Sequence, residues 1–150
     1  MRLPDGAVGA DGHPGWYRWD WVRPGEFAAV GVGGFIFRAE AGGLGRCRWY
    51  PTTVHLNNKG AIHGGAMMSF IDMALFAGGF FAGMEPGYYV TLDCATRFIA
   101  PGKIDRPIDA VVKLVGQTHG GLAFLSGECE QDGRTTASFT GTLKRLKPRG

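Results

Sequence analysis

The sequence predicts one α+β domain in which an antiparallel sheet wraps around a single long helix. Three observations carry this prediction. The run over residues 64–82 is apolar nearly all round, so a helix there must be covered on most of its sides. The segments before and after it alternate apolar and polar residues, as half-buried strands do. Gly-Gly at 120–121 and Asp-Gly at 132–133 are hairpin turns that would join such strands.

In chain order, the expected elements are two strands, the helix and four more strands. The strands are expected at residues 33–43, 45–58, 88–102, 108–119, 122–131 and 134–146. No internal repeat and no second domain are visible. The chain length of 150 residues also fits one domain with a sizeable core.

The front of the chain is different in composition. Residues 1–15 are rich in Gly and Pro and are expected to be loose. Residues 16–21 hold three tryptophans, which predict either a short helix or loop packed on the domain or a lid over a ligand site. We therefore divide the chain into an N-terminal extension, 1–26, and a main domain, 27–150.

Composition narrows the possible partners and the compartment. The net charge is only +3, and no basic stripe with interleaved aromatic residues predicts nucleic-acid binding. The three cysteines are widely spaced, and the N-terminus has no secretory apolar region, so a cytoplasmic protein with reduced thiols is expected. A membrane-spanning helix over 64–83 is rejected because Asp72 would lie near the bilayer centre.

Asp72 is the most informative single residue. It lies among apolar helix residues, and a buried carboxylate without partners is unfavourable. It is either an acid satisfied by structural contacts, or a general base or nucleophile at the wall of an apolar pocket. Thr91 opens the next strand, where it is either an ordinary strand residue or a hydroxyl that holds a water or the carboxylate.

A second polar group surrounds the expected helix start. Asn57 ends a strand, a position where Asn often simply forms a turn. His63 precedes Gly64 and Gly65 and can cap the helix or pack against it. The free N–H groups of a helix start, with the positive end of its dipole, suit an anion or a developing oxyanion. His63 has no ligand cluster near it in sequence, so no metal is expected.

The stretch NNKGAIHGGAMMSFIDMALF, followed by VTLDCATRFIAPG, resembles the hotdog-fold acyl-CoA thioesterases. It is most similar to their phenylacetyl-CoA thioesterase (PaaI-type) branch, whose motif is N-x-x-G-x-x-H-G-G with an acid on the following helix. The resemblance runs over residues 33–145 and leaves the tryptophan-rich front unmatched. It implies a hotdog fold and a thioester hydrolase that acts on acyl-CoA without a cofactor.

The resemblance also implies a role for each site residue. Asp72 is the nucleophile or general base, and the backbone N–H of Gly64 polarises the thioester carbonyl. His63 and Asn57 orient carbonyl and water, while Thr91 takes the place of a Ser or Thr near the acid. Eight helical residues separate Gly64 from Asp72, or roughly 12 Å, so we expect a homodimer, alone or as a dimer of dimers, to share the site.

Three other functions remain open on the sequence. A non-catalytic acyl-CoA-binding hotdog protein would not need Asp72, and a hotdog enoyl-CoA hydratase or dehydratase would use an Asp/His pair acting together. A purely structural oligomer would bind no ligand. Aromatic, short-chain and medium-chain acyl groups all suit an apolar pocket, which we expect to be lined by Met67, Phe70, Met73 and Phe76 or their neighbours.

Overall fold

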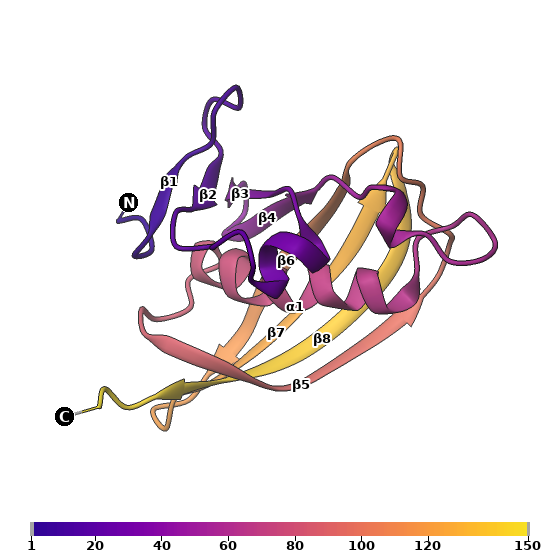
Figure 1. The fold of residues 1–150 in the computed structure, drawn as a ribbon. Helices are drawn as coiled ribbons and strands as arrows, with labels where there is room; N and C mark the ends of the chain where they lie inside the picture. Colours follow the sequence, from indigo (N-terminus) through magenta and orange to yellow (C-terminus); the bar gives the residue numbers. More distant parts are fainter. Residues whose placement is uncertain (1, 150) are drawn as a thin grey trace.

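The computed structural model describes residues 2–149 and shows one antiparallel sheet curved around one long helix (Figure 1). The strands are β1 (Ala7–Gly9), β2 (Tyr17–Trp19), β3 (Phe35–Glu40), β4 (Leu44–Trp49), β5 (Tyr88–Phe98), β6 (Ile108–Gln117), β7 (Leu122–Gln131) and β8 (Arg134–Leu146). Their order across the sheet is β1-β2-β3-β4-β6-β7-β8-β5. The long helix is α1 (Gly64–Phe81), and two short helical turns are η1 (Ala28–Val32) and η2 (Thr53–His55). The predicted α+β class is confirmed.

Helix α1 lies inside the curve of the sheet because most of its surface is apolar. Its buried residues are Met67, Phe70, Ile71, Ala74, Leu75, Ala77, Gly78, Gly79 and Phe81. Two glycines let its backbone approach the sheet closely. A Cβ on Gly45 of β4 would lie 2.1 Å from the Gly78 carbonyl oxygen, and a Cβ on Gly78 would lie 2.5 Å from Val112. Larger residues at either glycine would therefore push the helix off the sheet.

Helix α1 is also long and apolar enough to cross a membrane by length and composition. Half of that 18-residue window is buried inside the protein, however, as expected for the core helix of a curved sheet. The finding is therefore only weak support for a membrane span.

The N-terminal extension contains two three-residue strands, which the sequence did not predict. The expected packing of the tryptophan-rich segment on the domain is present, since Tyr17 and Trp19 lie against the core. Strands β1 and β2 form a hairpin, and Tyr17 pairs with Phe37 of β3, which lengthens the sheet. Tyr17 and Trp19 point to the core side, where Trp19 lies 4.5 Å from Phe37 between ring centroids. Strands of three residues are too short for their alternation to stand out in the sequence.

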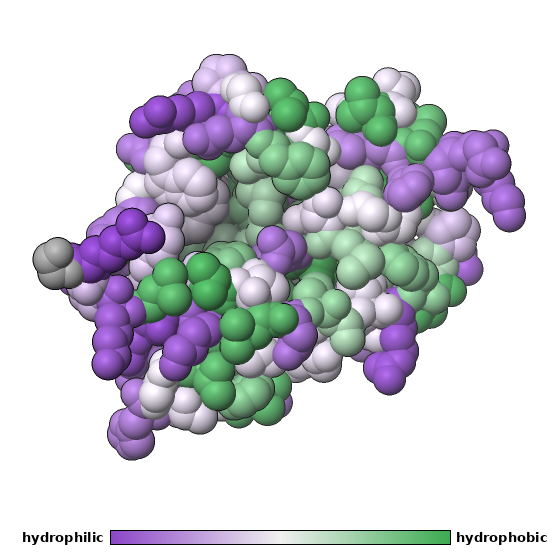
Figure 2. All heavy atoms as spheres, turned by 60° about the horizontal axis from the view of Figure 1, so that its bottom comes forward, coloured by the Kyte–Doolittle hydropathy of each residue, from purple (hydrophilic) through white to green (hydrophobic). Residues whose placement is uncertain are grey.

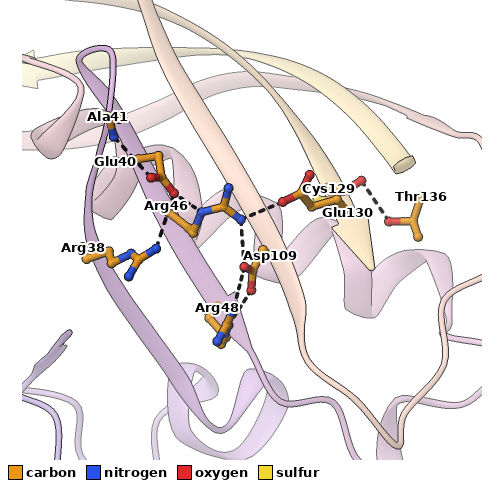
Figure 3. Close-up of polar contacts among 9 residues, drawn as sticks. All are labelled: Arg38, Glu40, Ala41, Arg46, Arg48, Asp109, Cys129, Glu130 and Thr136. Atoms are coloured by element: carbon orange, nitrogen blue, oxygen red, sulfur yellow. Dashed lines mark hydrogen bonds and ion pairs between the residues drawn. The ribbon is translucent and has the colours of Figure 1, made fainter. Parts of the chain in front are cut away.

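The face of the sheet that points away from α1 carries a network of charged side chains (Figure 3). Arg48 donates two hydrogen bonds to the Asp109 carboxylate, of 2.7 and 2.8 Å. Arg46 donates to Asp109 at 2.8 Å and to Glu130 at 2.7 Å, and it also pairs with Glu40. Each carboxylate of the network therefore has a guanidinium partner, as a partly buried charge requires.

Trp16, just before the second strand of the N-terminal hairpin, packs against arginines on this face of the sheet. Its indole ring contacts the guanidinium groups of Arg38 and Arg48, whose central carbons are 4.5 and 4.9 Å from the ring centroid. Only 7% of Trp16 is exposed. Two cation–π contacts on a buried ring hold the start of β2 in place.

Candidate active site

The packing of α1 against β5 brings Asp72 and Thr91 together. The Thr91 hydroxyl donates a hydrogen bond of 2.7 Å to Asp72 Oδ1. Asp72 is half-buried, and this charge-assisted bond holds its carboxylate in one orientation. The acid inside the apolar helix is therefore neither fully buried nor without a partner.

A β-bulge in β5 decides which side chains face Asp72. Thr91 pairs with Leu143 of β8, but Asp93 pairs with the adjacent Thr142, so Leu92 is an extra residue in the strand. Without a bulge, Thr91 and Cys94 would point to opposite faces, because strand side chains alternate. With the bulge, both face α1.

Asp72 lies in an open groove of about 370 Å³. The groove is lined by Phe27, Ala28, Met68, Ser69, Asp72, Met73 and Cys94. Figure 2 views the molecule from the side of β5, where apolar side chains (green) gather around a hollow. None of the three N-terminal tryptophans lines the groove, so the lid interpretation of that cluster finds no support in the groove lining.

Of the four helix residues named as the expected pocket lining, Met73 alone lines the groove, and the other helix residues there are neighbours of the named ones. Met67 and Phe70 are 4% and 0% exposed and belong to the core under the sheet. Met73 does line the groove, together with Met68 one residue beyond Met67. Phe76 packs against the core instead. The long helix is apolar on several faces, so hydrophobicity alone could not tell the core face from the groove face.

Cys94 contributes a neutral thiol to the groove. Burial raises the pKa of the Cys94 thiol, and the nearby charge of Asp72 raises it further, while a hydrogen bond with Thr96 lowers it. A thiol with a raised pKa is a poor nucleophile at neutral pH. Cys94 therefore acts as part of the apolar wall beside the acid.

A second group of residues surrounds the start of α1. His63 Nδ1 accepts a hydrogen bond of 2.9 Å from the Gly65 N–H, so His63 caps the helix. Asn57 Oδ1 accepts from the N–H groups of Lys59 and Ala61, at 2.9 and 3.1 Å, and closes the loop before the helix. Within residues 2–149, the N–H of Gly64 has no hydrogen-bond partner.

The five predicted site residues thus fall into two groups. Asp72 and Thr91 are in contact, and Asn57, His63 and Gly64 share the helix start. No hydrogen bond links the two groups in the described part of the chain. Residues 2–149 also hold no cluster of three His, Cys, Asp or Glu side chains placed to bind a metal ion.

Sequence reasoning missed His55, which joins the helix start to η1. Its backbone carbonyl accepts a bond of 2.7 Å from the His63 N–H. Its ring Nδ1 accepts from the Thr52 N–H at 2.8 Å, so Nε2 carries the proton and donates to the Gly31 carbonyl at 2.7 Å. The Thr-x-x-His capping box of η2 was the signal for this buried ring.

Comparisons with known proteins identify the fold. The structure superposes on the E. coli PaaI protein from the phenylacetic acid degradation operon with a TM-score of 0.67 and 24% identity, covering 82% of this chain and 86% of that one. A mutant of the phenylacetic acid degradation protein PaaI from Thermus thermophilus gives 0.66 and 23%, covering 81% and 100%. This chain has the hotdog fold. The hotdog fold that the resemblance in the sequence implied is therefore confirmed.

Two further comparisons bear on this hotdog domain. Residues 59–119 match the family model of the thioesterase superfamily, a segment that includes His63, Asp72 and Thr91. A hypothetical thioesterase from Streptococcus pneumoniae, solved with coenzyme A, has a TM-score of 0.65 and 19% identity, covering 78% of this chain and 92% of that one. A search of curated proteins gave no significant match.

Proposed function

We propose that this hotdog domain is an acyl-CoA thioesterase, which hydrolyses a thioester to a free carboxylic acid and CoA. The observation that carries the proposal is the Asp72 carboxylate, oriented by Thr91 in a largely apolar groove. The thioesterase-superfamily match over residues 59–119 supports it. So does the structural neighbour that was solved with coenzyme A.

In this mechanism Asp72 starts the attack on the thioester carbon. As a general base, it takes a proton from a water whose oxygen adds to the carbon; as a nucleophile, its own oxygen adds and water later releases the acid. In both routes the carbonyl oxygen gains negative charge, and the unpartnered N–H of Gly64 donates to it. The carbon–sulfur bond then breaks, and CoA leaves as a thiolate. In the general-base route the thiolate takes up the proton that Asp72 removed from water; in the nucleophilic route it takes a proton from solvent water, and a second water then hydrolyses the acyl–Asp72 anhydride. His63 and Asn57 keep the helix start in position.

A shared site in a homodimer resolves the separation of the two groups. Gly64 and Asp72 are eight residues apart on α1, or roughly 12 Å, whereas a reacting atom must lie about 3 Å from both. In a two-fold dimer with antiparallel helices, the helix start of one chain faces Asp72 of the other. We include a dimer of two such dimers in this proposal.

The sheet edge supports the same dimer. Strand β5 is 11 residues long and ends the sheet, so its outer edge is unpaired in the described chain. Tyr88, Leu92 and Phe98 on it are 78%, 57% and 56% exposed. Proteins rarely leave a long apolar edge uncovered, and a second copy of β5 would cover it.

The cellular compartment and the cofactor requirement are also part of this proposal. Free thiols are typical of cytoplasmic proteins, and Cys47, Cys94 and Cys129 are all free. The proposed mechanism uses no cofactor.

A panel of acyl-CoA substrates tests the function, with the released thiol followed colorimetrically. Thiol release from at least one acyl-CoA at an enzymatic rate is expected. Binding of acyl-CoA without thiol release would instead indicate a binding protein. Loss of enoyl absorbance from an enoyl-CoA, without thiol release, would indicate a hydratase.

A further inference from the structure

Among residues 2–149, Phe27 is the one aromatic residue that lines the groove around Asp72. It precedes η1 and lies outside the stretch that matches the thioesterase superfamily. Its side chain is 65% exposed although it lies beside a groove with apolar walls. An apolar group that covered the exposed ring would be stabilised there, because apolar surface would be removed from water.

Two buried side chains hold the backbone that carries Phe27. The Trp49 indole N–H donates a bond of 2.8 Å to the Val32 carbonyl, and His55 Nε2 donates one of 2.7 Å to the Gly31 carbonyl. Trp49 and His55 are 0% and 4% exposed, so both are fixed by the core. The segment η1 is therefore anchored at its end, whereas the ring of Phe27 at its beginning is open to solvent.

Gly31 fixes the direction of the Phe27 ring. A Cβ added to Gly31 would lie 2.3 Å from a ring carbon of Phe27, far inside van der Waals contact. The ring therefore occupies the space where a Cβ of residue 31 would be, and any larger residue at position 31 would turn it away. Gly31 has no positive φ angle, so Ala at this position would act on the ring without straining the backbone.

We propose that Phe27 is a specificity-determining residue, whose ring forms the wall that limits the acyl group lying beside Asp72. This inference rests on the proposed thioesterase function. Apart from Asp72, the other groove residues are Ala28, Met68, Ser69, Met73 and Cys94, and no basic side chain of residues 2–149 lines the groove. The Asp72 carboxylate would repel a second carboxylate. The site therefore takes uncharged, apolar acyl groups and rejects those that end in a carboxylate.

The test is the chain-length profile of kcat/KM, from acetyl-CoA to dodecanoyl-CoA. Phe27→Ala should raise the ratio of long-chain to short-chain kcat/KM by roughly fivefold, which is below the roughly 10–200-fold effect of a methylene in a closed pocket because Phe27 lines an open groove. Gly31→Ala should also change this ratio, because it moves the ring without removing it. Val30→Ala is the matched control: Val30 is 64% exposed on the same segment but does not line the groove.

Two results would overturn the proposal: Phe27→Ala and Gly31→Ala proteins that keep the wild-type profile, or equal kcat/KM for butyryl-CoA and succinyl-CoA in the wild type. If the wild type releases no thiol from any acyl-CoA, the thioesterase function fails on its own. In that case, the Kd of each acyl-CoA is measured by calorimetry, and the ratio of the long-chain Kd to the short-chain Kd is compared between the wild type and Phe27→Ala. An unchanged Kd profile in Phe27→Ala would overturn the role of Phe27 even as a binding residue.

Discussion

The two halves of the proposed site, at the start and in the middle of α1, are built in different ways. At the helix start, Asn57 and His63 bond to backbone N–H groups no more than four residues away. In the middle, Asp72 bonds to Thr91 across the packing of helix on strand. The side-chain bonds of the first half lie within one loop, whereas the bond of the second half exists only when α1 and β5 are packed together.

This difference predicts how each half responds to change. The local half should tolerate a change elsewhere in the fold and fail when its own loop opens. In the tertiary half, a change of Asp72 alone should lower the reaction rate. It should cost little stability, because the helix packs by its apolar residues.

The largest effect is expected from Asp72→Asn. The amide keeps an oxygen that can accept from Thr91 but is neither a base nor a nucleophile, so kcat should fall by at least about 100-fold. Thiol release measures the rate, and thermal unfolding checks that the fold is intact. A variant that folds normally and turns over near the wild-type rate would remove Asp72 from the chemistry.

The next largest effect is expected in the local half, from Asn57→Ala. Two loop N–H groups lose their acceptor, so the helix start should shift and kcat/KM should fall about tenfold, equivalent to about 1.4 kcal/mol. Asn58→Ala is the matched control, since Asn58 is exposed and its side chain makes no hydrogen bond within residues 2–149. Equal rates for the two variants would leave Asn57 as a turn residue with no part in the reaction.

A smaller effect is expected from Thr91→Val, which keeps the shape of the side chain but removes its hydroxyl. The carboxylate of Asp72 stays in place but loses the donor that orients it. We expect kcat to fall by about fivefold, or about 1 kcal/mol. Thr91→Ser should restore most of the rate. If Val and Ser variants behave alike, the hydrogen bond has no role in catalysis.

The smallest effect concerns Cys94 and needs no substrate. Burial, and then the charge of Asp72, raise the pKa of this thiol, so Asp72→Asn should lower that pKa. More thiolate is then present at a fixed pH near 8, and alkylation of Cys94 by iodoacetamide should become faster. Cys47 and Cys129 are buried and serve as unreactive controls in the folded protein. An unchanged or slower alkylation rate would show that Asp72 does not act on Cys94.

The same contrast explains what the sequence could predict. The helix and the six strands of the main domain follow from local patterns, and five of these strands lie close to their predicted positions. The strand predicted over residues 45–58 was wrong at its end: β4 stops at Trp49, and Asn57 lies in the loop after η2 instead of ending a strand. Asp72 stood out because a carboxylate in an apolar helix is unusual. Phe27 and His55 did not, because their positions depend on contacts between segments far apart in the chain.

The β-bulge at Leu92 and the strands in the N-terminal extension were missed for related reasons. An alternating pattern places Thr91 and Cys94 on opposite faces, and only the pairing with β8 shows the extra residue. In β1 and β2, three residues per strand give too little alternation to detect. The division of the chain at residue 26 stays a prediction, although the extension shares the sheet of the main domain.

The central claim is that one chain supplies the helix start and the other supplies Asp72, and complementation tests it most directly. Chains carrying Asp72→Asn and Asn57→Ala are co-expressed with different tags, and the mixed dimer is purified through both. One of its sites would combine an intact Asn57 with an intact Asp72, while the other would carry both changes. We predict about half of the wild-type activity in the mixed dimer, well above either parent homodimer. A mixed dimer with only the average activity of its two parents would contradict a site shared between chains.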